Sequence, residues 1–277
     1  MYIVKPEALK GKVDVVILDC RFDMDDPQKG RKLYQMCHIE GAQYVDLDED
    51  LVGEISEHGG RHPLRDLAEI RRTLEALGVD DKKEVYIYDS GEMPMAAVLW
   101  YVLQLVGKNA YVVEGGFDAL MQAGFALSDC AQAPLAGELK APDRLALRAD
   151  VNDALRSIED DCVALVDARG PNRYLGLEEP KDKIAGHIPG ALNIFWQDLL
   201  TADGRLKGEA ELLSIFAPLD AYDEVIFQCG SGITGAVNLL VYAHLGKSAR
   251  LYSGSYSDYI SYRGNKIIVK GGKELVL

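Results

Sequence analysis

The stretch that decides the fold reads Val225-Ile226-Phe227-Gln228-Cys229-Gly230-Ser231-Gly232-Ile233-Thr234, and an apolar run from Ala236 to Leu245 follows it. The first four residues are typical of a buried strand, and the apolar run is typical of a helix. Cys229 therefore lies on a tight loop that leads from a strand into the N-terminus of a helix. The glycines at 230 and 232 permit positive φ angles and a close curl of the backbone.

A thiol on such a loop has an unusual electrostatic environment. Backbone N–H groups of the loop can converge on one point, and the positive end of the helix dipole is directed at the same point. A cysteine placed there ionises more readily than a free one. The alternative is an inert, buried cysteine at the end of a core strand. The flanking glycines and the helix favour a reactive thiolate at Cys229.

Length and composition predict a globular protein of two domains. The chain has 277 residues, of which 48% are hydrophobic and 27% are charged. The N-terminus lacks a basic segment followed by an apolar one, and no stretch has the length of a membrane span, which predicts a cytoplasmic location. The net charge of −14 argues against nucleic acid and anionic membranes as partners. A site for an anionic substrate must therefore be basic locally.

The cysteines do not form the pattern of a disulfide framework or of a metal site. Five of them are scattered along the chain, at positions 20, 37, 130, 162 and 229, without a CxxC pair or a Cys/His cluster at zinc spacing. We therefore expect no metal and no cofactor. Cys20 and Cys162 lie in or beside apolar strands, which predicts that both are core residues.

The order of motifs in the first half recurs in the second half at an offset of roughly 140 to 150 residues, which indicates a domain duplication. Val163–Arg169 repeats the strand and the Asp-x-Arg ending of Val13–Arg21, and Glu224–Gln228 repeats Glu84–Tyr88. Strands alternate with helices in each copy, which predicts an α/β fold with a mainly parallel sheet flanked by helices. We expect domains at 1–128 and 149–277, joined by a linker at 129–148.

Taken together, these motifs resemble the tandem-domain rhodanese family, the thiosulfate and 3-mercaptopyruvate sulfurtransferases. The likeness covers essentially the whole chain. It rests on the following stretches: Gly60-Arg61-His62-Pro63-Leu64, Tyr88-Asp89, Glu114-Gly115-Gly116-Phe117, Val166-Asp167-Ala168-Arg169, Arg173-Tyr174-Leu175-Gly176, Gly186-His187-Ile188-Pro189-Gly190-Ala191, the loop from Cys229 to Thr234, and Gly254-Ser255-Tyr256-Ser257-Asp258.

The resemblance implies two rhodanese-like domains and a ping-pong transfer of sulfur. In that family a thiolate takes the outer sulfur of a small anionic donor, holds it as a persulfide, and passes it to a thiol or to cyanide. A thioredoxin-like protein is one such thiol acceptor. Asp89 stands at the position of Cys229 in the first copy. A carboxylate cannot carry the sulfur, so only the second domain is expected to be catalytic.

The loop and its neighbours imply the nature of the donor. Gly230 and Ser231 stand where thiosulfate-preferring members look like Arg-Lys, so the loop resembles the mercaptopyruvate branch, with thiosulfate as a second donor. Arg173 matches one family anchor for the donor. Lys181 stands where a second Arg is usual, and it supplies charge without a bidentate contact. The remaining residues expected to surround the donor are Gly232, Ile233 and Thr234.

Three residues match a proton relay that has been proposed in the mercaptopyruvate branch. Ser231 matches its serine, His62 matches its histidine, and Asp50 is the carboxylate nearest to the third position. Thr234 either donates its hydroxyl to the sulfur or caps the helix. Of the other histidines, His38 and His187 occur in both copies and are predicted to be structural. His58, in an acidic loop that is rich in glycine, is predicted to be solvated.

Two other functions are compatible with parts of the pattern. A phosphatase of related fold would need an Arg to close the loop, but Gly235 follows Thr234, which disfavours that reading. A non-catalytic carrier that holds a persulfide for a partner stays open. Asp167 and Arg169 follow a core strand, and we expect them to brace loops through a salt bridge rather than to contact substrate.

Overall fold

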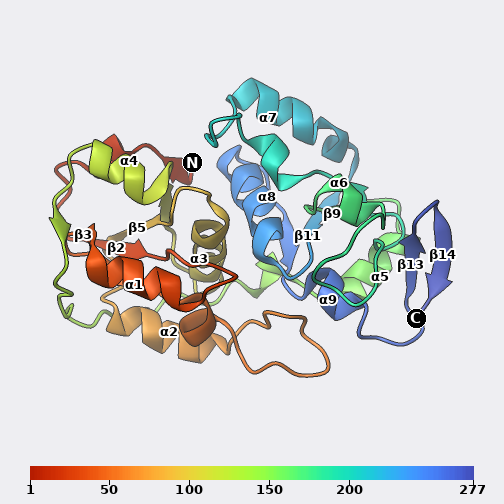
Figure 1. The fold of residues 1–277 in the computed structure, drawn as a ribbon, viewed down its shortest axis with the longest axis horizontal. Helices are drawn as coiled ribbons and strands as arrows, with labels where there is room; N and C mark the ends of the chain where they lie inside the picture. Colours follow the sequence, from red (N-terminus) through yellow and green to blue (C-terminus); the bar gives the residue numbers. More distant parts are fainter. The chain divides into compact units, whose positions relative to one another are not determined.

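The computed structural model describes residues 1–277 and groups them into two units (Figure 1). The first unit contains Met1–Gly53 and Arg65–Leu145, and the second contains Glu54–Leu64 and Ala146–Leu277. Each unit holds one five-stranded sheet in which every neighbouring pair of strands is parallel. The predicted α/β fold with two parallel sheets flanked by helices is therefore confirmed. The short stretch Glu54–Leu64 belongs with the second unit, although the sequence places it within 1–128.

The first sheet has the strand order β1-β6-β5-β2-β4. Its strands are β1 (Ile3–Val4), β2 (Val15–Asp19), β4 (Gln43–Tyr44), β5 (Glu84–Tyr88) and β6 (Tyr111–Val113). Its helices are α1 (Gln28–Met36), α2 (Leu67–Ala76), α3 (Pro94–Leu105) and α4 (Gly116–Gln122), with short turns at η1 (Pro6–Leu9) and η2 (Leu47–Leu51). A small antiparallel pair, β3 (His38–Ile39) with β7 (Leu127–Ser128), lies outside the sheet.

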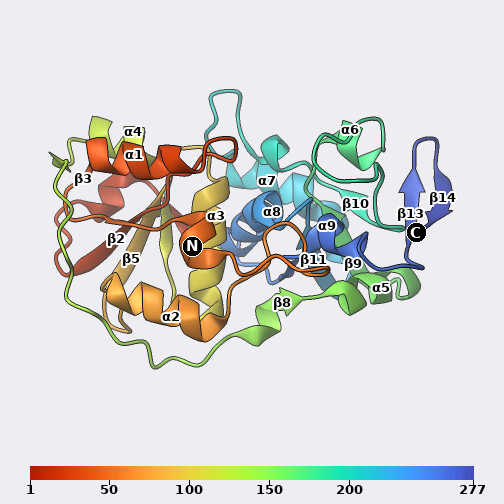
Figure 2. The ribbon, with the colours of Figure 1, turned by 60° about the horizontal axis from the view of Figure 1, so that its bottom comes forward.

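Alternation along the central strand β5 explains how this unit buries both faces of its sheet. Tyr86 and Tyr88 pack in one apolar cluster with Ile39 and with Leu120 of α4. Because successive side chains of a strand point to opposite faces, Val85 and Ile87 face the other side. Figure 2 shows α1 and α4 on one side of the sheet and α2 and α3 on the other. Helices on both faces are what a parallel sheet requires.

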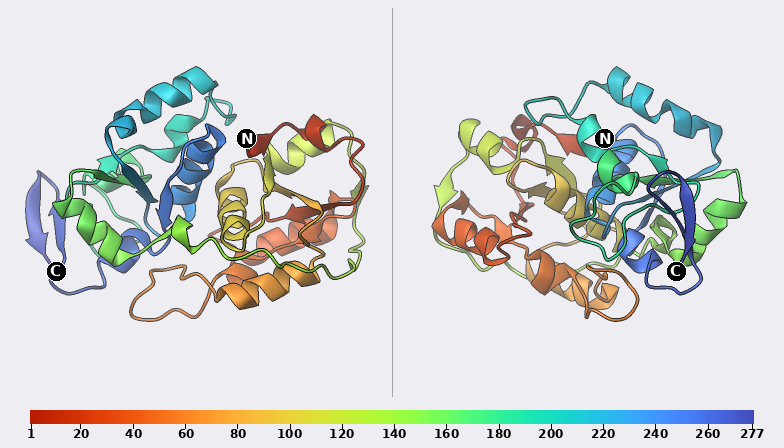
Figure 3. Two further views of the ribbon diagram at one scale, coloured as in Figure 1. Left: turned by 180° about the vertical axis from the view of Figure 1, so that it is seen from behind. Right: turned by 45° about the vertical axis from the view of Figure 1, so that its right-hand side comes forward.

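The second sheet has the corresponding order β10-β9-β11-β12-β8. Its strands are β8 (Arg148–Ala149), β9 (Val163–Asp167), β10 (Leu192–Asn193), β11 (Glu224–Gln228) and β12 (Arg250–Tyr252). Its helices are α5 (Val151–Glu159), α6 (Pro171–Tyr174), α7 (Glu209–Phe216), α8 (Ile233–His244) and α9 (Ser255–Tyr259), with short turns at η3 (Leu145–Leu147), η4 (Trp196–Leu199) and η5 (Ala217–Ala221). A C-terminal hairpin of β13 (Lys266–Val269) and β14 (Lys273–Val276) lies at the periphery of this unit (Figure 3).

The same alternation organises the core of the second unit around β11. Ile226 packs in a cluster with Ala154 of α5 and with Tyr256 of α9. Phe227 points to the opposite face, where its ring makes edge contacts with Phe216 of α7 and Tyr242 of α8 at centroid distances of 6.1 and 5.4 Å. Both faces of β11 are thus packed, which fixes where the strand ends and where Cys229 begins the loop.

The two units repeat one bracing ion pair at the end of their first long strand. Arg21 binds Asp19 and donates to Cys37 O at 2.7 Å, and Arg169 binds Asp167 and donates to Gly186 O at 2.9 Å. All four of these side chains are almost completely buried. The prediction that Asp167 and Arg169 hold neighbouring segments together is therefore confirmed.

The duplicated histidines are structural in both units. His38 Nδ1 lies 2.7 Å from Tyr34 O, and its ring stacks on Tyr34 at a centroid distance of 4.0 Å. His187 repeats both contacts with Tyr174, at 2.7 and 3.9 Å. Burial lowers the pKa of His187, so this ring is neutral at pH 7. Each histidine joins a short helix to the segment that follows it.

Several sequence-based expectations need correction. Cys162 is exposed, not a core residue, because it lies in the turn just before β9, whereas Cys20 is buried as predicted. Strand β4 ends at Tyr44, and a π-helical turn begins at Leu47. The residues predicted as a linker lie along the first unit as far as Leu145, where Arg71 donates to Leu139 O at 2.8 Å and to Ala141 O at 3.0 Å. All five cysteines are free thiols, and no helix has the length and apolarity needed to cross a membrane.

Candidate active site

The loop after β11 places the sulfur of Cys229 against a helix N-terminus. Gly232 is the N-cap of α8 and has a φ of 86°. Its N–H donates to Cys229 Sγ at 3.2 Å. Cys229 is buried, with 3% of its surface exposed. This is the environment expected from the sequence: a sulfur that receives a backbone N–H at the positive end of a buried helix.

Glycine is required at position 232 for two reasons. The positive φ strains any residue with a side chain. A Cβ there would also lie 2.4 Å from Ser253 O, which is a backbone atom. Because Gly232 is the cap and α8 begins at Ile233, Thr234 is the second residue of the helix. The expectation that Thr234 caps the helix is therefore wrong, whereas a hydroxyl contact from Thr234 to a donor stays a prediction.

Ser255, the first residue of helix α9, holds the loop through hydrogen bonds. The N–H of Cys229 donates to Ser255 Oγ at 3.0 Å, and Ser255 Oγ donates to Tyr252 O at 2.8 Å. Ser255 is fully buried and has a φ of 56°, an unfavourable value for a residue other than glycine. Two further N–H groups of α9, from Tyr256 and Ser257, donate to the carbonyls of Cys229 and Gly230 at 3.0 and 2.9 Å. The backbone of the nucleophile loop is thus fixed on both sides.

Two guanidinium groups flank the loop at Gly230. A Cβ at Gly230 would lie 2.9 Å from an Nη2 atom of Arg61 and 3.1 Å from Nη2 of Arg173. The sequence predicted Arg173 as an anchor but gave no role to Arg61. Burial lowers the pKa of Arg61, and the negative charge of Cys229 acts in the opposite direction. Arg61 and Arg173 thus bring two cationic groups to the space beside the loop, although the whole chain is acidic.

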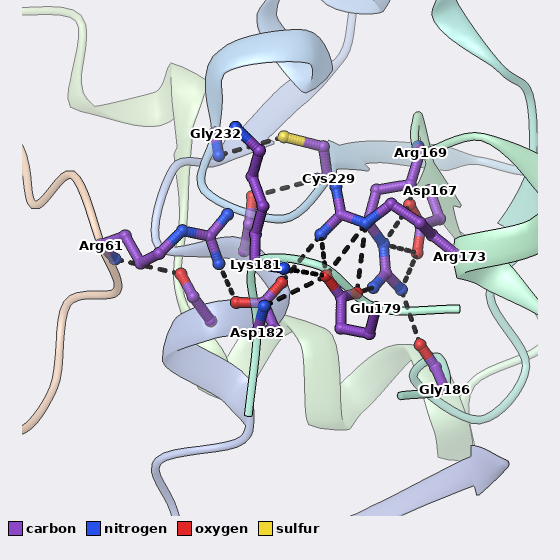
Figure 4. A network of polar contacts seen from close by, with 12 residues as sticks. Arg61, Asp167, Arg169, Arg173, Glu179, Lys181, Asp182, Gly186, Cys229 and Gly232 are labelled. Carbon is purple, nitrogen blue, oxygen red and sulfur yellow. Dashed lines mark hydrogen bonds and ion pairs between the residues drawn. The ribbon is translucent and has the colours of Figure 1, made fainter. Parts of the chain in front are cut away.

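Two buried carboxylates hold these guanidinium groups (Figure 4). Arg173 donates through Nε and Nη2 to Glu179, with the shortest distance 2.7 Å, and through Nη2 to Asp182 at 3.0 Å. The other oxygen of Asp182 binds Arg61 Nη1. The side chains of Glu179 and Asp182 are only 3% and 2% exposed. Glu179 also binds Arg169 Nη1 at 3.3 Å, which joins the site to the bracing ion pair.

The short segment Glu54–Leu64 reaches the site because backbone contacts attach it to α9. Gly59 N donates to Asp258 Oδ1 at 2.7 Å, and Arg61 N donates to Ser257 Oγ at 3.1 Å. His58 is exposed as expected, but it is also ordered: its ring stacks on Tyr262 at 4.0 Å, and Nδ1 lies 2.7 Å from Ser261 Oγ. These contacts fix the position of Arg61 and of His62, which follows it.

His62 is electrically neutral at physiological pH. Burial, reinforced by the positive charges of Arg61 and Lys181, lowers its pKa to about 4. Its Nδ1 is buried without a hydrogen-bond partner. A neutral imidazole with an unpaired ring nitrogen is able to receive a proton or to orient a polar group of a ligand.

The other predicted residues are placed as follows. Ser231 is buried in the loop, at 8% exposure. Lys181 is exposed and donates its backbone N–H to Glu179, and Figure 4 shows its side chain directed toward the Cys229 loop. Asp50 lies in the π-helical turn of the first unit, where its carboxylate accepts Asp46 N–H at 2.8 Å, and burial raises its pKa. The structure therefore places Arg173 and Lys181 beside the loop that contains Ser231, and roles for His62 and Asp50 stay predictions.

The corresponding loop of the first unit has no thiol. Asp89 follows β5 and is 5% exposed. Its carboxylate accepts N–H groups from Gly91 and Ala96 at 2.8 and 3.3 Å, and burial raises its pKa. Met93 caps α3 with a φ of 82°, which corresponds to Gly232 in the second unit. In the first unit, therefore, a carboxylate accepts backbone N–H groups at the position where the sulfur of Cys229 accepts the N–H of Gly232 in the second unit.

Comparisons with known proteins agree with this geometry. The model of the rhodanese-like domain matches residues 6–123 and 150–262. A Pseudomonas aeruginosa protein named a probable 3-mercaptopyruvate sulfurtransferase is 36% identical over 261 residues, which cover 92% of each chain. A Mycobacterium tuberculosis protein, whose name assigns it provisionally to the thiosulfate sulfurtransferases, is 34% identical over 89% of this chain and 88% of its own.

Among solved structures, the 3-mercaptopyruvate sulfurtransferase from Leishmania major superposes with a TM-score of 0.83 at 27% identity, over 93% of this chain and 74% of that one. The structure shows no group of three or more His, Cys, Asp or Glu side chains that could hold a metal ion. The chain belongs to the rhodanese-like family, because the domain model matches each half and both halves have the same strand order and the same bracing residues.

Proposed function

We propose that the protein is a sulfurtransferase that moves a sulfane sulfur through a persulfide on Cys229. The observation that supports this most directly is the N–H of Gly232 donating to Cys229 Sγ at the N-terminus of α8. Hydrogen bonds to an ionised acceptor are stronger than neutral ones, so this contact favours the thiolate and, after transfer, the persulfide anion.

The reaction has two half-steps. In the first, the Cys229 thiolate attacks the sulfur of the donor, and an S–S bond forms while the bond from that sulfur to the donor breaks. With 3-mercaptopyruvate the electron pair leaves on the enolate of pyruvate, which then takes a proton; with thiosulfate it leaves on sulfite. In the second half-step an acceptor thiolate or cyanide attacks the outer sulfur, and Cys229 leaves as the thiolate again. A thioredoxin-like protein is a suitable thiol acceptor.

3-Mercaptopyruvate is the donor that the site fits best. The loop residues Gly230 and Ser231 carry no charge, so the cations for the donor carboxylate must come from outside the loop. Arg61 and Arg173 each direct an Nη2 atom to the same place beside Gly230. Together they place two positive charges beside a donor carboxylate, and Arg61 compensates for Lys181 at the position where the family usually has a second Arg.

We propose that His62 and Ser231 handle the proton that the enolate needs, with Asp50 as the third member of the relay. A neutral His62 can accept a proton from a donor thiol and return it to the leaving group. Its low pKa ensures that the imidazole is unprotonated before the donor binds. Ser231 lies between the nucleophile and the helix cap in sequence, where its hydroxyl is available to link ligand and imidazole.

A steady-state assay with 3-mercaptopyruvate and thiosulfate, each with cyanide or a dithiol as acceptor, tests the function. The expected result is turnover of both donors with the higher efficiency for 3-mercaptopyruvate, and no turnover in Cys229→Ser. If neither donor is turned over while a persulfide still forms on Cys229, the protein is a carrier and the proposed enzyme is wrong.

A further inference from the structure

Asp182 is the one carboxylate that bridges both guanidinium groups beside the nucleophile loop. One of its oxygens binds Arg61 Nη1, and the other accepts from Arg173 Nη2 at 3.0 Å. The second oxygen would also lie 3.4 Å from a Cβ at Gly230, so it faces the loop together with the two cations. Only 2% of the Asp182 side chain is exposed.

The charges around the loop are balanced by this residue. The buried network contains the three guanidinium groups of Arg61, Arg169 and Arg173 and three carboxylates, which belong to Asp167, Glu179 and Asp182. Lys181 and the Cys229 thiolate add one charge of each sign. The site is therefore electrically neutral before a donor enters. Partly buried charges are screened weakly, so each further charge that a donor brings has a large effect on binding.

We propose that Asp182 is a positioning and specificity-determining residue that matches the site to a monoanionic sulfur donor. Its carboxylate holds Arg61 and Arg173 on either side of Gly230 and cancels one of their two positive charges. A monocarboxylate donor adds one negative charge to this neutral site beside the two guanidinium groups. A dianion such as thiosulfate adds two negative charges, so its binding is disfavoured more strongly. This inference rests on the proposed function, since it concerns which donor the same site prefers.

The test is the ratio of the two catalytic efficiencies, kcat/KM for thiosulfate divided by kcat/KM for 3-mercaptopyruvate. Asp182→Asn removes one negative charge with little change in shape. One unit charge a few ångströms away at the effective dielectric constant of a protein surface changes this ratio by about tenfold or more in favour of the dianion. The matched control is Asp203→Asn, which removes the same charge from a side chain that is 68% exposed and outside the network. The control is expected to leave the ratio unchanged.

A purely structural role of Asp182 would lower both efficiencies in parallel and leave their ratio as it is. That result, in a variant that is folded and active, overturns the inference. Because loss of a buried ion-pair partner can unfold a protein, Arg61→Gln provides a second test in the opposite direction. It removes a positive charge from the same bridge, so the ratio is expected to fall by about tenfold. A ratio that rises or stays constant in Arg61→Gln also overturns the inference.

These outcomes are distinct from a failure of the proposed function. If the unmodified protein turns over neither donor, the proposed sulfurtransferase itself is wrong and with it the inference about Asp182. If the unmodified protein is active and both ratios stay constant, only the assignment of donor selectivity to Asp182 is lost.

Discussion

Replacement of Gly232 by alanine tests the link between backbone conformation and sulfur chemistry. The residue has a φ of 86°, and an added Cβ would lie 2.4 Å from Ser253 O. The left-handed conformation costs a residue with a side chain about 1–2 kcal/mol. The backbone must also shift to remove the overlap with a backbone oxygen, which destabilises the protein by about 1–3 kcal/mol more, as in other overpacked sites. Gly232→Ala is therefore expected to lower the free energy of unfolding by about 2–5 kcal/mol.

The same substitution displaces the N–H that Gly232 donates to Cys229 Sγ at 3.2 Å. A hydrogen bond to a charged group contributes about 1.5–3 kcal/mol, which corresponds to about 10- to 150-fold in rate. We expect kcat/KM for 3-mercaptopyruvate to fall within that range. The rate of alkylation of Cys229 by iodoacetamide at neutral pH is expected to fall as well, because the sulfur loses the N–H that Gly232 donates to it.

Gly246 provides the matched control at the other end of the same helix. Its φ is 80°, but an added Cβ there meets nothing within 4 Å. Gly246→Ala therefore carries the conformational cost of about 1–2 kcal/mol without the clash. It is expected to keep the activity of the unmodified protein. Urea unfolding gives the stabilities, and kinetics on the folded fraction give the efficiencies. The reasoning is refuted if Gly232→Ala is folded and as active as Gly246→Ala.

Three further predictions concern the support of the loop and its charges. Gly230→Ala is expected to raise KM for 3-mercaptopyruvate at least severalfold with a smaller change in kcat, because the added Cβ displaces the ends of the Arg61 and Arg173 side chains. A constant KM in steady-state kinetics would contradict this. Ser255→Gly relieves the positive φ but removes the hydroxyl that accepts the N–H of Cys229. The free energy of unfolding, measured in urea, should therefore change by less than about 1 kcal/mol, while kcat/KM in the donor assay falls about tenfold. A parallel loss of stability and activity would argue against a positioning role. His62 has a folded-state pKa of about 4, below its ordinary value of 6.5, so the unfolded chain binds the proton more tightly, and the stability that is fully present above pH 6.5 is lost as the pH falls towards 4. The urea midpoints at pH 7 and pH 5 should therefore differ less in His62→Gln than in the unmodified protein. An equal difference in the two proteins would remove His62 as the cause.

Sequence reasoning reached the nucleophile because the pattern there is local. A strand, Cys229, two glycines and an apolar helix follow one another without a gap, and each element constrains the next. The duplication was equally visible, since both copies repeat the Asp-x-Arg ending of a core strand. The structure adds that Arg21 and Arg169 make the same contacts in both units, which explains why that ending recurs.

The rest of the site depends on contacts between segments that are distant in the chain. Arg61 reaches the loop only because Gly59 and Arg61 are attached to α9, which lies almost 200 positions later in the sequence. Its one sequence signal was its place directly before His62. Glu179 and Asp182 are surrounded by Pro180, Lys181 and Lys183, which reads as a solvated charged stretch, although both carboxylates are buried. Burial of a charge follows from its partners, and the partners are not visible in a local pattern.

Ser255 illustrates a conformational feature that the sequence does not mark. The equivalent residue of the first unit is Gly116, with a φ of 57°, almost equal to the 56° of Ser255. The unit without a thiol uses glycine, for which this conformation has no steric cost. The unit with Cys229 uses a serine in the same strained conformation and gains an acceptor for the N–H of the nucleophile. Strain retained at one of two equivalent positions is consistent with a functional role.

Mass spectrometry of peptides after incubation with 3-mercaptopyruvate and no acceptor tests the central claim most directly. The account predicts that the peptide containing Cys229 gains the mass of one sulfur atom, and that a subsequent thiol acceptor removes it. The exposed thiols of Cys130 and Cys162, whose pKa values are raised by neighbouring carboxylates, should remain unmodified. Sulfur found on Cys130 or Cys162 and absent from Cys229, or found on no cysteine while pyruvate is still produced, would contradict a persulfide mechanism at this loop.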